Sequence, residues 1–89
     1  MPKLKVLFVD RVNRFSLEVD LETGRNYIGI PVRNSMVEYT EWYEVIDKDT
    51  FAKCQADPTQ AHDMVGKARR REIDHLLLLK PGRDRGEPD

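Results

Sequence analysis

Alternating apolar and polar residues in the first half of the chain predict β-strands. In the clearest case Phe15, Leu17 and Val19 alternate with polar side chains. A period of two is typical of a strand with one packed and one solvent-facing side. Short polar turns separate the apolar segments, which favours an antiparallel meander. The predicted strands span residues 3–9, 14–21, 27–32 and 36–46.

Helix-start signals appear in the second half. The strongest is Asp57-Pro58 followed by Gln60, which combines an N-cap acid, proline at the first helical position and a capping-box glutamine. Asp47 is a similar cap for a shorter helix. The predicted helices span residues 48–56 and 58–72.

After the second helix, residues 76–79 are four consecutive leucines, which predict an inner strand over residues 76–80. Residues 81–89 lack an apolar anchor, so we expect a disordered charged tail. The chain is therefore predicted to be one α+β domain, residues 1–80, with about five mostly antiparallel strands and two helices on one face. The opposite face is expected to carry Ser16, Glu18, Asp20, Met36 and Trp42.

The amino-acid composition and the net charge limit the classes of protein to which this chain could belong. The chain has 89 residues, of which 35% are charged, and its net charge is −1. A single cysteine, Cys54, excludes an internal disulfide and fits a reducing compartment. The first residues lack the apolar stretch of a signal peptide, and no apolar run is long enough to cross a membrane. We expect a cytoplasmic protein without membrane contact.

The most distinctive segment is the acidic aromatic strand over residues 36–46. It holds the only Trp and two of the three Tyr, and residues 38–49 carry five carboxylates against one lysine. Aromatic anchors framed by carboxylates would suit a docking surface for a cationic protein. The candidate protein-binding residues are Glu38, Glu41, Trp42 and Glu44.

Two other interpretations of this segment remain open. Tyr39 and Tyr43 could pack in the core while the acids only keep a sheet edge soluble. The acidic segment could also pair with basic residues of the same chain or of a second copy. Because a core of this size is thin, a homodimer fits the sequence as well.

A basic group near the end of the second helix gives the first alternative function. Cations there could contact nucleic-acid phosphates, or could simply interact favourably with the helix C-terminus. Three contiguous arginines surround the helix instead of forming one stripe, and the chain as a whole is slightly acidic, so nucleic-acid binding is disfavoured. The residues concerned are Lys67, Arg69, Arg70 and Arg71.

Catalytic and metal-binding patterns are weak. Glu72 and His75 have the spacing of half a carboxylate–histidine metal site, but no second half exists. Cys54 is predicted to be a buried, inert thiol, and Ser16 and Ser35 have no nucleophile-elbow context. We therefore expect no catalytic residues, no metal and no cofactor.

The leading functional hypothesis is a small, non-enzymatic protein-interaction module that uses the acidic aromatic strand. Its most concrete form is an inhibitor-like or immunity-like protein that neutralises a cationic partner. A nucleic-acid-associated accessory protein is the first alternative. A small enzyme or ligand-binding protein without a readable motif is the second.

Overall fold

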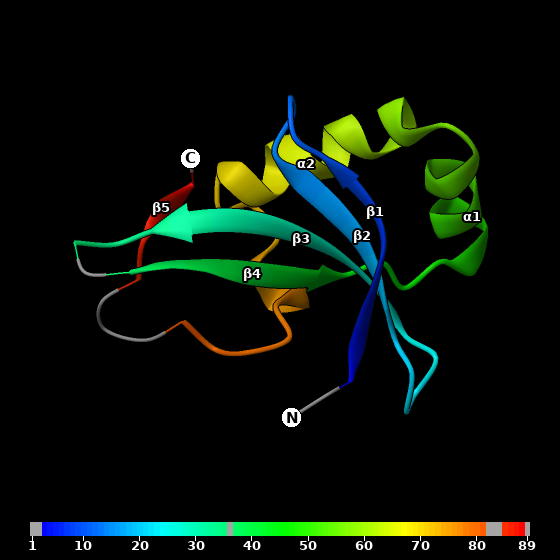
Figure 1. Ribbon diagram of the computed structural model, residues 1–89, viewed down its shortest axis with the longest axis horizontal. Helices are drawn as coiled ribbons and strands as arrows, with labels where there is room; N and C mark the ends of the chain where they lie inside the picture. Colours follow the sequence, from blue (N-terminus) through cyan, green and yellow to red (C-terminus); the bar gives the residue numbers. More distant parts are fainter. Residues whose placement is uncertain (1–2, 36, 82–84, 89) are drawn as a thin grey trace.

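The computed structural model describes residues 3–35, 37–81 and 85–88. As Figure 1 shows, a strongly twisted antiparallel sheet lies against two helices. The α+β prediction is confirmed, and strands 1 to 4 follow one another in sequence order. The elements are β1 (Leu4–Asp10), β2 (Phe15–Asp20), β3 (Asn26–Arg33), β4 (Glu38–Glu44), α1 (Lys48–Ala56), η1 (Pro58–Ala61), α2 (His62–Arg69), η2 (Asp74–Leu76) and β5 (Glu87–Pro88).

Polar side chains fix the hairpins that set the strand register. The Asp10 carboxylate accepts hydrogen bonds from the backbone amides of Val12 and Asn13 at the β1–β2 turn. In the β2–β3 turn, Gly24 has a φ of 76°, a conformation that side-chain-bearing residues rarely adopt. The resulting registers place Leu17 opposite Ile28 and Ile28 opposite Tyr43. These pairs direct alternate residues of three strands into one core.

The helices begin where the sequence predicts. The Asp47 carboxylate accepts from the Asp49 amide at the start of α1, and Asp57 caps η1, which continues into α2. The second helical segment ends earlier than predicted, at Arg69 instead of residue 72. Arg71 adopts a left-handed φ of 62°, and the Glu72 amide bonds to the Lys67 carbonyl, which is a Schellman ending.

Both helices cover one side of the sheet, where the hydrophobic core lies (Figure 1). Buried side chains of β2, β3 and β4 meet apolar side chains of α1 and α2 there. Cys54 is 2% exposed in this core, as its position on α1 predicted. The core residues are Phe15, Leu17, Ile28, Ile30, Val32, Tyr43, Val45, Phe51, Cys54, Ala61, Val65 and Ala68.

The prediction of an inner strand over residues 76–80 was wrong. Leu76 ends the short helix η2, and Leu77 forms only an isolated bridge to Tyr43 at the edge of β4. Leu76 and Leu77 pack against the core, whereas Leu79 is 51% exposed. The apolar run is therefore explained by one-sided packing along a sheet edge and not by insertion between strands.

The tail expected to be disordered includes residues 85–88, which the structure places against the sheet. Pro88 and Glu87 pair with Val32 and Arg33 of β3, beyond the N-terminal start of β2. Residues 82–84 and 89 of that tail lie outside the described residues. Within the described part of the chain, no helix has the length and apolar character needed to cross a membrane.

Candidate functional site

The side of the sheet that the helices leave uncovered carries a mixed apolar and polar face, here called the open face. It includes Ser16, Glu18 and Trp42, as predicted, because the register places Ser16 and Trp42 on either side of Gly29. Asp20 is buried at the end of β2, where it accepts from the Glu22 amide, and Met36 lies outside the described residues. Trp42 is half-buried.

A groove of about 640 Å³ runs across the open face. One wall comes from the edge strand β1, where Val6 and Val9 are 52% and 53% exposed. Trp42 and Pro31 supply apolar surface on the opposite side. The lining residues are Val6, Val9, Asp10, Arg11, Arg14, Phe15, Ser16, Glu18, Gly29, Pro31, Thr40 and Trp42.

The Glu18 carboxylate lies in this groove although only 6% of the residue is exposed. Its Oε2 accepts hydrogen bonds from the indole Nε1 of Trp42 at 2.8 Å and from the Ser16 hydroxyl at 2.7 Å. Gly29 makes room for this arrangement. A Cβ at that position would lie 2.7 Å from Glu18 Oε2 and 2.6 Å from Ser16 Oγ. The missing side chain of Gly29 therefore allows Glu18 to hold the indole in place.

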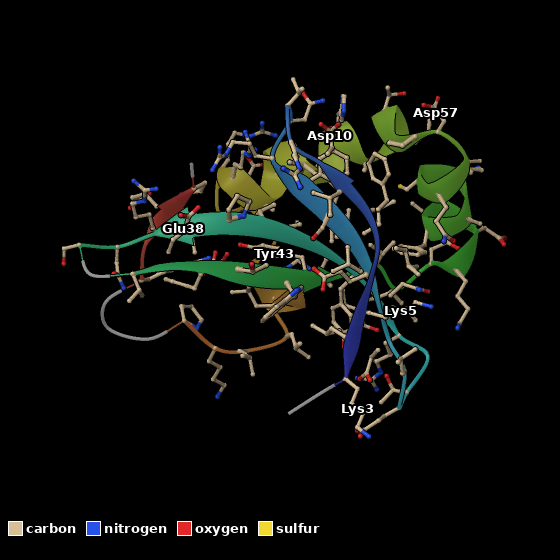
Figure 2. All side chains as sticks on the ribbon, viewed as in Figure 1. Lys3, Lys5, Asp10, Glu38, Tyr43 and Asp57 are labelled. Carbon is tan, nitrogen blue, oxygen red and sulfur yellow. The ribbon has the colours of Figure 1, made fainter. Side chains whose placement is uncertain are left out.

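The four residues predicted to bind a protein do not form one surface. Glu38, Trp42 and Glu44 have the same parity in β4 and therefore share the open face. Figure 2 shows Glu38 beside the arrowhead end of β3. Glu38 pairs with Arg33 at 3.3 Å, and Glu44 lies 4.0 Å from Arg25. Glu41 has the opposite parity in β4, so it points to the helix side and is 7% exposed. It is therefore not part of the same face as Trp42.

Glu41 instead forms the centre of a partly buried ionic cluster. Arg71 donates to Glu41 Oε1, and Arg85 donates to Oε2 at 2.8 Å and to Oε1 at 3.2 Å. Arg85 also binds both oxygens of Asp74, at 2.6 and 2.9 Å. These hydrogen bonds hold the pKa of Asp74 below its ordinary value. Burial, followed by the nearby Glu41 charge, raises the pKa of Tyr43.

The basic residues near the end of α2 are engaged within the chain. Lys67 forms an ion pair one turn along its own helix, and Arg69 reaches back to the turn between β1 and β2. Arg71 points into the ionic cluster and not toward solvent. The partners are Asp63 for Lys67, the Asn13 and Arg14 carbonyls for Arg69, Glu72 for Arg70 and Glu41 for Arg71. The four residues thus do not present a common cationic surface.

The side chains of Cys54 and Ser16, which were considered for catalysis, are buried or hydrogen-bonded within the chain. The Cys54 thiol lies in the core, where burial raises its pKa. The Ser16 hydroxyl donates to a carboxylate. Among residues 3–35, 37–81 and 85–88, no three His, Cys, Asp or Glu side chains come close enough to hold a metal ion.

The contacts of two residues, Glu18 and Arg85, could not be predicted from the sequence. Period-two alternation places Glu18 on the open face, but only the register across β3 brings it to Trp42 and Gly29. Arg85 sits in a segment without apolar anchors, so nothing local indicates that it binds Glu41 and Asp74. No known protein family, curated protein or solved structure matches this chain.

Proposed function

We propose that this chain is a non-enzymatic protein-interaction module that binds a partner through the open face, with Trp42 at the centre of the contact. The observation that carries the proposal is the groove beside the half-buried indole, on the side of the sheet opposite the helices. Tryptophan, with tyrosine and arginine, is enriched among the residues that dominate binding energy in protein interfaces. The hydrogen bond to Glu18 holds the indole in one orientation, which lowers the entropy cost of binding.

The exposed apolar wall of the groove supports the same proposal. Val6 and Val9 lie on an edge strand, and both keep about half of their surface exposed. A partner that covered them together with the indole would bury apolar area and gain about 25 cal/mol per Å² before association costs. The inhibitor-like role toward a cationic protein in the cytoplasm is the most concrete form of this proposal. A second copy of the chain is a competing occupant that the experiment below separates.

The geometry favours this proposal over the nucleic-acid alternative. Phosphate binding needs several cations free to face one backbone. Three of the four basic candidates contact carboxylates, and Arg69 donates to backbone carbonyls. Freeing these cations would break existing ion pairs, which disfavours nucleic-acid binding.

Site-specific photocrosslinking tests the proposal. A photoreactive phenylalanine analogue placed at Val9 or Thr40 samples the groove, and the same analogue at Gln55, exposed on α1, samples the opposite side. We expect both groove positions to crosslink one identified protein and Gln55 not to do so. Trp42→Ala should then weaken binding of that purified partner by at least about thirtyfold, corresponding to a loss of about 2 kcal/mol.

Three outcomes would count against the proposal. Equal crosslinking from the groove and from Gln55 would remove the assignment to the open face. Crosslinks only to a second copy of the chain would replace the partner by a homodimer. A folded Trp42→Ala variant that binds the purified partner as tightly as the original chain would remove Trp42 from the contact.

A further inference from the structure

Three carboxylates in the described part of the chain are buried, and Glu18 differs from the other two. Glu41 is neutralised by Arg71 and Arg85. Asp20 accepts from a backbone amide and from the Thr23 hydroxyl within its own turn. Glu18 is 6% exposed and, within residues 3–35, 37–81 and 85–88, forms no ion pair. A buried charge without a cation is costly unless something else compensates it.

The remaining hydrogen-bonding capacity of Glu18 belongs to one oxygen. Both donors, Trp42 Nε1 and Ser16 Oγ, bind Oε2. Oε1 has no donor in the described part of the chain, and the residue lines the groove. The groove therefore ends on an oxygen atom that can accept one more strong hydrogen bond.

The surroundings of this oxygen fit an amphipathic cation. Val6 and Val9 provide apolar surface on one side of the groove, and Pro31 with the Trp42 ring provides it on the other. Such walls suit the alkyl stem of a long cationic side chain.

We propose that the groove receives a single lysine side chain of the partner protein, with the ammonium group on Glu18 Oε1 and the stem along Val6, Val9 and Trp42. This inference rests on the proposed function and names the partner's contact group. Lysine fits better than arginine because only one carboxylate oxygen is free. The planar guanidinium gains its advantage from bidentate contact with two oxygens, whereas an ammonium acts as a point charge.

The rim of the groove limits which lysine can bind. Arg11 and Arg14 lie at the margin together with Asp10, which Figure 2 shows at the hairpin end of β1. Arg14 is paired with Glu38, so Arg11 is the rim cation expected to repel a second lysine and to attract an acidic residue beside the bound lysine. The expected recognition element on the cationic partner is therefore one lysine that stands apart from the partner's other basic residues and has acidic residues beside it.

Nuclear magnetic resonance tests this inference without a protein partner. Because the chain has one Trp, the indole N–H of Trp42 gives a single side-chain signal that reports on its hydrogen bond to Glu18. The probes are capped Glu-Lys-Glu, Glu-Arg-Glu, Glu-norleucine-Glu and Lys-Lys-Lys tripeptides. We expect a saturable shift with Glu-Lys-Glu and at least about tenfold weaker binding of the other three, as expected for loss of a charge-assisted hydrogen bond.

Glu18→Gln, which keeps an acceptor for the indole but removes the charge, should weaken Glu-Lys-Glu binding by about tenfold or more. Glu22→Gln removes one exposed carboxylate in the β2–β3 turn and should leave binding unchanged. Equal binding of the norleucine peptide, or no saturable shift with Glu-Lys-Glu, would overturn the inference using the unaltered chain alone. Such a result would leave the crosslinking test of the open face independent, so failure of the lysine site and failure of the proposed function are distinguishable.

Discussion

Replacing Arg85 by alanine should destabilise the domain far more than the position of Arg85 in a charged tail suggests. The arginine side chain is 19% exposed and binds Glu41, which is 7% exposed, and Asp74, which is 38% exposed. Removing one partner of a fully buried pair costs about 3–5 kcal/mol, because the other charge stays buried. Glu41 would keep Arg71, and Asp74 is partly solvated. We therefore expect a loss of about 2 kcal/mol.

Urea unfolding followed by circular dichroism measures this loss, and thermal unfolding checks it. For a domain of this size, 2 kcal/mol corresponds to a decrease in Tm of roughly 8–16 °C. The matched control is Arg70→Ala, which removes an arginine whose ion pair with Glu72 is about half exposed on both sides. That variant should lose less than about 1 kcal/mol. If Arg85→Ala lost no more than Arg70→Ala, the ionic cluster would not anchor residues 85–88 to the domain.

Three further predictions follow from other contacts. The pKa of Asp74 is lower in the folded protein than its ordinary value of 3.8, so its contribution to stability is fully present above that value and is lost as the pH falls through the lower folded-state pKa. In urea titrations, the difference in stability between the original chain and Arg85→Ala should therefore narrow as the pH is lowered below the ordinary pKa of Asp74. Gly29→Ala should cost about 1–3 kcal/mol in the same assay, because the added Cβ would collide with Ser16 and Glu18; an unchanged midpoint would show that those side chains move aside freely. The thiol of Cys54 should react with a disulfide reagent on the order of a hundredfold more slowly in the folded protein than in urea, and equal rates would contradict its burial.

Local sequence patterns determined most of the secondary structure. Alternating apolar and polar residues give β2 one apolar face, and this is true wherever the strand lies in a sheet. Asp47 and Asp57 cap helices through contacts within three residues, so their signals are complete in the sequence. The same parity rule correctly placed Trp42 on the sheet face opposite the helices, together with Ser16 and Glu18.

Such local patterns could not predict contacts between residues that are far apart in the sequence. Four consecutive leucines predict a strand buried on both sides, but two-sided burial requires an open position inside the sheet, and the continuous meander of β1 to β4 leaves none. Grouping Glu41 with Trp42 followed their closeness in sequence, although adjacent strand residues point to opposite faces. The partners of the basic residues near the end of α2 could not be predicted either, because Arg71 leaves the helix in a left-handed conformation that turns it toward Glu41.

The amino-acid sequence alone determined an α+β chain with capped helices and placed Trp42 on the sheet face opposite the helices, because each of those features depends on neighbours a few residues apart. Only the tertiary structure decided that Glu18 lies against Trp42 across the gap left by Gly29, and that Arg85 closes an ionic cluster on Glu41. Those contacts join residues 24 and 44 positions apart. The energies of these contacts depend on how deeply the residues are buried and on which charges become neighbours. Burial and charge neighbours are both fixed by the strand register and by the return of the C-terminal segment to the sheet, which exist only in the folded protein.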